Sequence, residues 1–271
     1  MIPLLGRPLA LEDRAEIARM REAEGPLNLI CVGDFNIPES SAYFDQIAKL
    51  GKILKTPVFR INLNSCGDLA DAIAKLAVPP ENRSFLFLRP FDRRFASYAR
   101  AIDPSQDPDR YSLRASADLY EGKIAFLPAT ARAALRLIRS VLPDLKGKRA
   151  LVIGRSVSVG LPIFHALMRE GAFCSLAHSQ VAPTDIADCA RSSDIVVLAS
   201  GKQGLISPAD LREGQVIIDC GFHPDGQGDL GFIPSAELSG YYTPVPGGVG
   251  PLTVVSLFHN AYALRKVNHG C

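Results

Sequence analysis

The order of apolar and polar positions predicts strands and helices that alternate along the first half of the chain. The strands expected there are short apolar runs at residues 26–33, 56–63 and 84–88. The helices expected from apolar positions at helical spacing are residues 9–23, 40–54 and 68–78. Ser40 or Ser41 is the expected cap of the second helix. Because strands alternate with helices, we expect a parallel sheet whose ligand site lies beyond the carboxyl ends of its strands.

The same alternation returns in the second half of the chain. Strands rich in valine and isoleucine are expected at residues 172–179, 193–201 and 214–221, with helices at residues 130–142 and from Thr184 onward. Strands of this composition are typical of a parallel sheet that is buried on both faces, as in a Rossmann-like domain. Residues 89–124 are rich in proline, aspartate and serine, which favours loops. We therefore expect the first domain to end near the end of that region.

The clearest motif is the stretch ALVIGRSVSVGLP at residues 150–162, where an apolar run stops at Gly154 and a helical pattern begins at Gly160. The first N–H groups of a helix lack intrahelical partners and lie at the positive end of its dipole, so such a turn can bind a pyrophosphate. Ser156 stands where a dinucleotide motif has its second glycine. An ordinary strand–helix turn remains the alternative interpretation.

The strand after this helix indicates which dinucleotide would bind. An NAD site usually carries a carboxylate about 20 residues beyond the first glycine. Residues 177–180 read Ala, His, Ser, Gln and hold no carboxylate, while Arg155 lies inside the turn. This combination favours a 2′-phosphate and hence NADP over NAD. The alternative is that Arg155 is only a solvated loop residue.

Composition narrows the class of protein further. The 271 residues are 47% hydrophobic with a formal net charge of +2, which gives no reason to expect nucleic acid or an acidic membrane as a partner. No apolar run is long enough to span a bilayer, and the N-terminus does not read as a signal peptide. The 6 cysteines form no C-x-x-C pair, and the 5 histidines show no ligand spacing. We expect a cytoplasmic protein with reduced thiols and no metal.

Several short motifs are distributed over nearly the whole chain. The most specific is PVPGGVGP at residues 244–251. The others are LLGRPLA at 4–10, VGDFNIPESSAY at 32–43, GRSVSVGLP at 154–162, SDIVVLASG at 193–201, IIDCG at 217–221 and GDLGF at 228–232. Together, and in their order along the chain, they resemble the bifunctional methylenetetrahydrofolate dehydrogenase/cyclohydrolase family.

The resemblance implies a two-domain α/β fold. An N-terminal α/β substrate domain would comprise residues 1–122 with 253–271, because the C-terminal helix returns to it. A Rossmann-like, parallel-sheet NAD(P)-binding domain would comprise residues 123–252. The resemblance also implies NADP or NAD as cofactor, a folate substrate in the cleft, and a homodimer.

Site residues follow from the resemblance position by position. The cofactor-binding candidates are Thr130, Gly154, Arg155, Ser156, Gly160, His178, Ser179, Gly201, Gly250 and Thr253. The substrate-binding candidates are Tyr43, Asp109, Pro246, Gly247 and Gly248, of which Tyr43 and Asp109 are also the catalytic candidates. Glycine suits the closing loop because a backbone without side chains approaches flat rings closely.

The chain departs from the family at the helix that carries Tyr43. The family has Tyr-x-x-x-Lys, which places a phenol and an ammonium on one helical face. Here the position of the lysine is Ile47. Lys49 and Lys52 do not replace it, because their spacing from Tyr43 turns them to other faces of the helix.

Two further departures lie in the loops expected at the same edge. The family's Gln-Leu-Pro-Leu-Pro begins here with Leu88, so the glutamine is lost. In its Asp-Val-Asp-Gly the second aspartate survives as Asp109, but the glycine is Arg110. Asp109 could pair with the donor edge of a pterin; otherwise it is a solvated loop residue. The arginines near this edge that could grip an anion or simply be solvated are Arg89, Arg93, Arg94, Arg110 and Arg114.

Chemistry separates the two family activities. Hydride transfer from a methylene between two nitrogens needs mainly alignment with the nicotinamide. Hydrolysis of the methenyl product needs proton transfers, which isoleucine and leucine cannot perform. We predict an NADP-dependent methylenetetrahydrofolate dehydrogenase whose cyclohydrolase activity is lost or very weak. The alternatives are an oxidoreductase of the same fold for another, anionic substrate, and a non-catalytic dinucleotide-binding protein.

Overall fold

The computed structural model describes residues 1–91, 95–121 and 126–269, and it divides into two compact units. The three-stranded unit comprises Glu12–Phe126 and Val254–Cys271, and the six-stranded unit comprises Met1–Leu11 and Leu127–Thr253. Every paired strand is parallel, which confirms the predicted α/β class. The expected division into a substrate and a nucleotide domain stays a prediction. The compact units differ from it chiefly in Met1–Leu11, which groups with the six-stranded unit.

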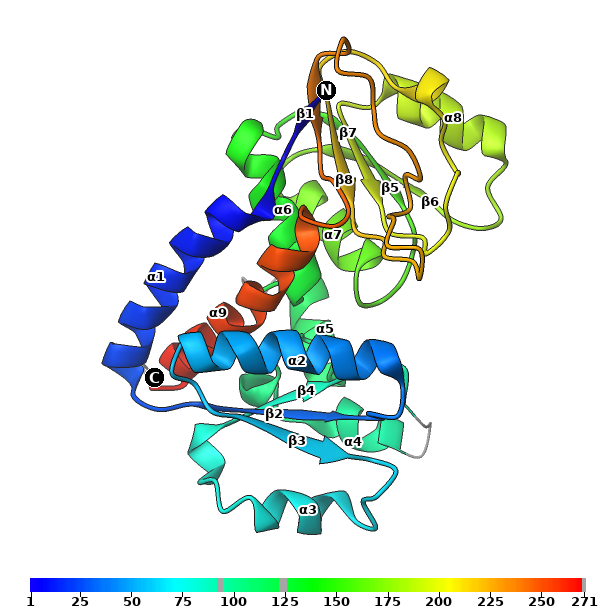
Figure 1. The fold of residues 1–271 in the computed structure, drawn as a ribbon. Helices are drawn as coiled ribbons and strands as arrows, with labels where there is room; N and C mark the ends of the chain where they lie inside the picture. Colours follow the sequence, from blue (N-terminus) through cyan, green and yellow to red (C-terminus); the bar gives the residue numbers. More distant parts are fainter. Residues whose placement is uncertain (92–94, 122–125, 270–271) are drawn as a thin grey trace. The chain divides into compact units, whose positions relative to one another are not determined.

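In the three-stranded unit, parallel strands alternate with helices as the sequence predicts (Figure 1). The sheet order is β3-β2-β4, with β2 Asn28–Gly33, β3 Val58–Asn62 and β4 Arg83–Phe87. The helices are α1 Gly6–Glu24 (in this unit from Glu12), α2 Pro38–Ile53, α3 Leu69–Lys75, α4 Ala96–Ala101, α5 Leu113–Glu121 and α9 Val249–His269 (in this unit from Val254). Helices α4 and α5 occupy a region expected to be loops. The proline and aspartate turns lie before and between them, as short connections.

Successive side chains of β2 lie on opposite faces of the sheet, and apolar residues lie on both. Ile30 and Val32 join a core with Leu69 of α3 and Ala99 of α4. The intervening residue Cys31 is also fully buried, and it lies near Tyr43 of α2. Figure 1 shows α2 and α3 on opposite faces of this sheet.

Helix α2 begins earlier than expected, at Pro38, with Ile37 as its cap residue. Proline suits the first turn of a helix because its missing N–H would have no intrahelical partner there. Ser40 and Ser41 therefore lie inside the first turn, and the prediction that one of them caps the helix is wrong. Tyr43 and Ile47 both lie within α2, one turn apart on the same face of the helix.

The last helix, α9, is anchored in the three-stranded unit by buried polar contacts. The Tyr262 hydroxyl lies 2.8 Å from Thr56 Oγ1, and Asn260 Nδ2 donates to the Pro108 carbonyl at 2.8 Å. A Cβ added at Gly51 of α2 would overlap Val58 and contact Phe258. The contact with Pro108 fixes the loop that carries Asp109, so α9 supports one of the predicted site residues.

In the six-stranded unit, the strand order is β1-β9-β8-β7-β5-β6 (Figure 1). The strands are β1 Ile2–Pro3, β5 Arg149–Ile153, β6 Phe173–Ala177, β7 Ile195–Leu198, β8 Gln215–Asp219 and β9 Gly240–Tyr242, and the helices are α6 Ala129–Val141, α7 Gly160–Arg169 and α8 Pro183–Ser192. Leu151, Ile153 and Val196 pack with Ile186 of α8 in one core. Helices α6 and α7 contact the sheet as well. The valine-rich strands are therefore buried, as their composition predicts.

The apolar pattern of the sequence did not predict the strands β1 and β9. They pair with each other, Ile2 with Tyr241, and β9 continues the sheet from β8. Two- and three-residue strands carry too few positions to show a period of two. Their pairing explains why the first residues of the chain belong to this unit.

Replacing Tyr262 with phenylalanine tests the anchoring of α9. The variant keeps the buried ring but leaves the Thr56 hydroxyl without this partner. We expect the free energy of unfolding, measured by urea denaturation, to fall by about 1–2 kcal/mol. Tyr98→Phe on α4, where the side chain is exposed, is the control and should change it by less than about 0.5 kcal/mol. Equal urea midpoints for Tyr262→Phe and the wild type would contradict the anchoring.

Candidate active site

The turn after β5 is built on backbone contacts that only glycine allows. Gly154 has φ +130°, and a Cβ there would overlap the carbonyl of Ala199, which follows β7. A Cβ at Gly160, the first residue of α7, would overlap the carbonyl of Gly154. The turn therefore folds back on itself and against the neighbouring loop, at the carboxyl edge of the sheet where ligands bind in such folds.

The free N–H groups near this turn do not lie at the start of α7, where the sequence predicts them. The Ser156 hydroxyl accepts the N–H groups of Val159 at 3.2 Å and Gly160 at 3.3 Å, so the start of α7 is already capped. Within the described part of the chain, the N–H groups from Arg155 to Ser158 donate to no protein acceptor. The free donors suited to a phosphate thus lie in the turn itself, rather than on the first residues of the helix.

Arg155, His178 and Ser179 lie at neighbouring strand ends. Strands β5 and β6 pair with Ile153 opposite Ala177, and Gly154 N–H donates to the Ala177 carbonyl at 2.9 Å. Arg155 and Ser179 are both exposed, just beyond this pair. A guanidinium and a hydroxyl without a carboxylate nearby in sequence fit the 2′-phosphate of NADP.

The closing loop belongs to the same unit as this turn. Gly247 has φ +115°, and its carbonyl accepts the N–H of Gly6 at 3.0 Å. A Cβ at Gly248 would overlap Thr243, whereas Gly250 has open space. Pro246, preceded by a cis peptide bond, is exposed. The loop is thus a tightly folded backbone segment in which Gly247 is half-buried and Gly248 is buried, while Pro246 and Gly250 are exposed.

The remaining cofactor candidates take different positions in the six-stranded unit. Gly201 follows β7 in an open left-handed conformation, φ +67°. Thr130 lies in the first turn of α6. Thr253 lies in the first turns of α9, where its hydroxyl donates to the Val249 carbonyl at 3.1 Å. Their roles in cofactor binding stay predictions.

In the three-stranded unit, Tyr43 lies in an electrostatic cluster. Burial raises the pKa of its phenol well above the usual range, the charge of Asp109 adds to this rise, and Arg89 opposes it. The Arg89 guanidinium lies 3.6 Å from the Asp109 carboxylate. The phenol is therefore protonated near neutral pH, so that it can donate a hydrogen bond but cannot act as a base. The structure thus brings both catalytic candidates, Tyr43 and Asp109, into one cluster.

The two lost family positions are filled by packed apolar side chains. Ile47 is fully buried on α2, and Leu88 is 3% exposed after β4. A Cβ at Gly33, at the end of β2, would lie 2.9 Å from the Leu88 Cβ. Lys49 and Lys52 are exposed, as their helical spacing predicts. Among the described residues, the cation that acts on the Tyr43 phenol is Arg89.

The arginines of this region do not form one cluster. Arg110 is 2% exposed, donates to the Pro104 carbonyl at 2.7 Å and lies 3.9 Å from Asp118, so it fits neither of the two alternatives, an anion ligand or a solvated side chain. Its φ of +55° is the left-handed conformation that favours glycine, the family residue at this position. Arg114 is exposed. Arg93 and Arg94 lie outside the described residues.

Two features of the structure were not predicted from the sequence. One is the set of contacts that Arg89 makes, and the other is a pair of carboxylates in the six-stranded unit. Arg89 and Arg100 both lie over the ring of Tyr111, at 5.1 and 5.5 Å from its centroid. Asp219 and Asp229 bind backbone N–H groups at the carboxyl edge of the six-stranded sheet. Gly221 of IIDCG and Gly228 of GDLGF were the available signal for this pair in the sequence, because each lies close to one of the two carboxylates.

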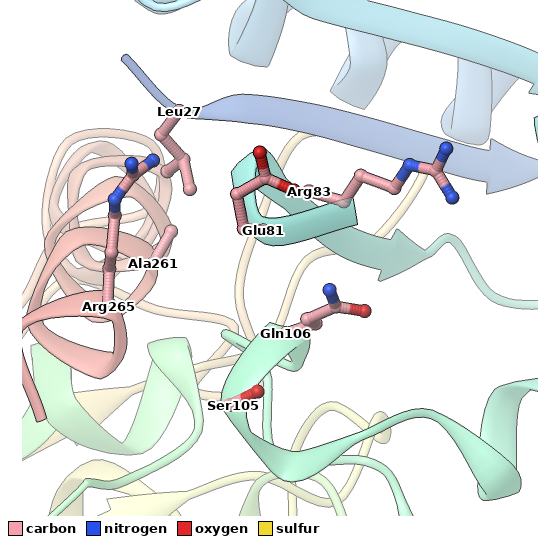
Figure 2. A pocket seen from close by; sticks show the side chains of 7 residues that line it. All are labelled: Leu27, Glu81, Arg83, Ser105, Gln106, Ala261 and Arg265. Atoms are coloured by element: carbon pink, nitrogen blue, oxygen red, sulfur yellow. The ribbon is translucent and has the colours of Figure 1, made fainter. Parts of the chain in front are cut away.

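A cavity of about 200 Å³ opens elsewhere in the three-stranded unit (Figure 2). It is lined by Leu27, Glu81, Arg83, Ser105, Gln106, Ala261 and Arg265. Two of the polar side chains around it already have partners: Arg83 Nε donates to the Val78 carbonyl, and Gln106 Nε2 donates to that of Pro80. None of the predicted site residues lines it.

Two other expectations can be compared with the described residues. They contain no group of three or more metal-ligating side chains and no helix that is long and apolar enough to cross a membrane. The cysteines described, Cys31, Cys66, Cys174, Cys189 and Cys220, are free thiols.

A doubly covered parallel sheet with a glycine-lined turn at its carboxyl edge defines a dinucleotide-binding α/β protein. Residues 128–269 match the family described as "Tetrahydrofolate dehydrogenase/cyclohydrolase, NAD(P)-binding domain". A bifunctional protein FolD of Geobacillus kaustophilus is 33% identical over 260 residues, which are 93% of this chain and 90% of that protein. The chain belongs to the tetrahydrofolate dehydrogenase/cyclohydrolase family.

Solved structures agree over the full length. The bifunctional FolD methylenetetrahydrofolate dehydrogenase/cyclohydrolase of Campylobacter jejuni superposes with a TM-score of 0.88 at 26% identity, covering 99% of both chains. The N5,N10-methylenetetrahydrofolate dehydrogenase-cyclohydrolase of Trypanosoma brucei, solved with NADP and an inhibitor, has a TM-score of 0.87 at 26% identity, covering 100% of this chain and 99% of that one. The predicted family and Rossmann-like fold are confirmed.

Gly160 and Gly250 each lie at the start of a helix, so replacing them gives a matched test of the backbone contacts at the nucleotide turn. Alanine normally stabilises a helical position relative to glycine by about 1 kcal/mol. At Gly160 the added methyl would overlap the Gly154 backbone, whereas at Gly250 it meets open space. We expect Gly160→Ala to lower the free energy of unfolding and weaken NADP binding, and Gly250→Ala to leave stability unchanged or raised.

Urea denaturation and isothermal titration calorimetry with NADP measure the two effects. A Gly160→Ala protein as stable as the wild type, with unaltered NADP affinity, would contradict the close backbone approach in this turn.

Proposed function

We propose that the chain is an NADP-dependent methylenetetrahydrofolate dehydrogenase with little or no cyclohydrolase activity. The observation that carries this proposal is a contrast between two sites. The nucleotide turn keeps its family glycines, Gly154 and Gly160, in close backbone contact. The positions of the family's lysine and glutamine hold the buried side chains of Ile47 and Leu88.

The cofactor would be held by the six-stranded unit. The N–H groups of the turn from Arg155 to Ser158 suit the pyrophosphate, and Arg155 with Ser179 suits the 2′-phosphate, which is why we propose NADP rather than NAD. When bound, the nicotinamide supplies the acceptor for the hydride. The half-buried backbone of Gly247, beside the exposed Pro246, would contact the ring in this unit.

The folate would be held in the three-stranded unit by Tyr43 and Asp109. A protonated phenol donates a hydrogen bond, and an aspartate carboxylate accepts two hydrogen bonds from the donor edge of a pterin. Such contacts fix the orientation of the substrate, which is what hydride transfer requires. A pterin would have to compete with Arg89 for the Asp109 carboxylate.

Hydrolysis of the methenyl cation requires a group that moves protons while water adds and a C–N bond breaks. Ile47 and Leu88 have no such group. A guanidinium such as that of Arg89 does not replace an amine base. The chain would then carry out only the oxidative half of the family's chemistry, and membership of the family adds the expectation of a cytoplasmic homodimer.

Paired assays on the purified protein test the proposal. With 5,10-methylenetetrahydrofolate and NADP, we expect NADPH to form, with slower turnover when NAD replaces NADP. With the 5,10-methenyl compound, we expect loss no faster than in buffer. Absorbance measures both reactions. No reduction of either nucleotide would overturn the dehydrogenase assignment, and rapid methenyl loss would overturn the missing hydrolase.

Restoring the two family side chains gives a stricter test. The double variant Ile47→Lys, Leu88→Gln should hydrolyse the methenyl compound at least about tenfold faster than the wild type, because it returns a titratable amine one helical turn from Tyr43. The matched control is Ala48→Lys with Leu88→Gln, which adds a lysine on a different face of α2. Equal hydrolysis by both double variants would contradict the assigned position.

A second candidate function is oxidation of an anionic, non-folate substrate. The observation that favours it is the pair of guanidinium groups, Arg89 and Arg100, over the ring of Tyr111. Their positive charges could bind a carboxylate near Asp109. In the same set of measurements, a chain that binds NADP but neither binds nor oxidises methylenetetrahydrofolate would favour this candidate over the first.

A further inference from the structure

The loop after β8 is wrapped around a carboxylate. Asp219, the last residue of β8, accepts the N–H groups of Gly221 at 2.8 Å and Asp229 at 3.0 Å on Oδ1, and that of Leu230 at 2.8 Å on Oδ2. Its own N–H donates to Thr243 Oγ1 at 2.7 Å. These bonds close the loop at both ends and fix the backbone that carries Asp229.

Asp229 reaches from this loop to the segment that follows β7. Its Oδ2 accepts the Ser200 N–H at 2.7 Å, the Ser200 hydroxyl at 2.9 Å and the Gly201 N–H at 2.9 Å. Its Oδ1 lies 2.9 Å from His223 Nε2. The side chain is fully buried. Both carboxylate oxygens are therefore engaged, and the Ser200–Gly201 turn is held through two backbone groups at once.

Two glycines leave the space that the Asp219 and Asp229 carboxylates occupy. A Cβ at Gly221 would overlap the Asp229 carboxylate, and a Cβ at Gly228 would overlap that of Asp219. Two glycines without positive φ values are thus required by packing rather than by backbone conformation. The arrangement is a built feature of this edge of the sheet and cannot be a chance contact between surface side chains.

The turn that Asp229 holds touches the nucleotide turn directly. Strands β5 and β7 pair with Ile153 opposite Leu198. Beyond them, a Cβ at Gly154 would overlap Ala199 and lie 3.0 Å from the Ser200 nitrogen. The contact from Ser200 to Gly154 is therefore backbone against backbone, with no flexible side chain to absorb a displacement.

We propose that Asp229 is a positioning residue for the dinucleotide: by fixing the Ser200–Gly201 turn against Gly154, it sets the affinity for NADP without touching the nucleotide. This inference rests on the proposed binding of NADP at that edge. Without the carboxylate, the two N–H groups and the hydroxyl would turn toward other acceptors, and the backbone packed against Gly154 would move with them.

The test compares substitutions at the two ends of β7. Asp229→Asn keeps one oxygen acceptor, and Asp229→Ala removes both. Asp194→Asn is the matched control, because Asp194 precedes β7 at the opposite edge and binds the Arg149 N–H and the Arg212 guanidinium. We expect the Kd for NADP, from titration calorimetry, to rise about 10- to 100-fold for Asp229→Ala and less for Asp229→Asn, with the Asp194→Asn value within about twofold of the wild type.

Amide hydrogen exchange supplies the second readout, and Asp229→Asn carries the test if Asp229→Ala does not fold. Ser200 and Gly201 should exchange faster in Asp229→Asn and at the wild-type rate in Asp194→Asn. Unchanged NADP affinity and unchanged protection in Asp229→Asn would overturn the inference, as would equal weakening by Asp194→Asn. A wild-type chain that binds no NADP would contradict the proposed function instead, and the exchange rates would still decide whether Asp229 holds the turn.

Discussion

The apolar side chains at the two family positions near Tyr43 are the constraint on which the functional account depends. A buried isoleucine or leucine offers neither a proton nor a hydrogen bond. Ile47 is fully buried, and Leu88 packs against Gly33. The proposed chemistry therefore depends on orientation and electrostatics and assigns no proton transfer to these two positions.

The nucleotide edge is built on a different physical basis. There the contacts are between backbone segments, and glycine at residues 154 and 160 lets them approach as closely as they do. A carboxylate, Asp229, ties the neighbouring turn to the same edge. One unit can thus keep a precise backbone geometry while side chains in the other unit diverge. This separation explains how a family member could retain hydride transfer after losing groups needed for hydrolysis.

Sequence periodicity predicted the parallel α/β architecture because long apolar runs and amphipathic helices carry their own signal. It failed at β1 and β9, which are too short to show a period, and at α4 and α5, which are interleaved with turn residues. For the site, the family motifs predicted Tyr43, Asp109 and the glycine turn, whose roles stay predictions. They did not reveal that Arg110 is buried or that Ser156 caps α7, since both depend on contacts that only the folded chain defines.

The most direct test follows both products in one reaction. The protein is supplied with 5,10-methylenetetrahydrofolate and NADP, and the methenyl and 10-formyl products are quantified against the NADPH formed, with a buffer control for spontaneous hydrolysis. The account predicts that methenyl product accumulates in step with NADPH and that the formyl product appears only at the control rate. Formyl product appearing in step with NADPH would contradict it.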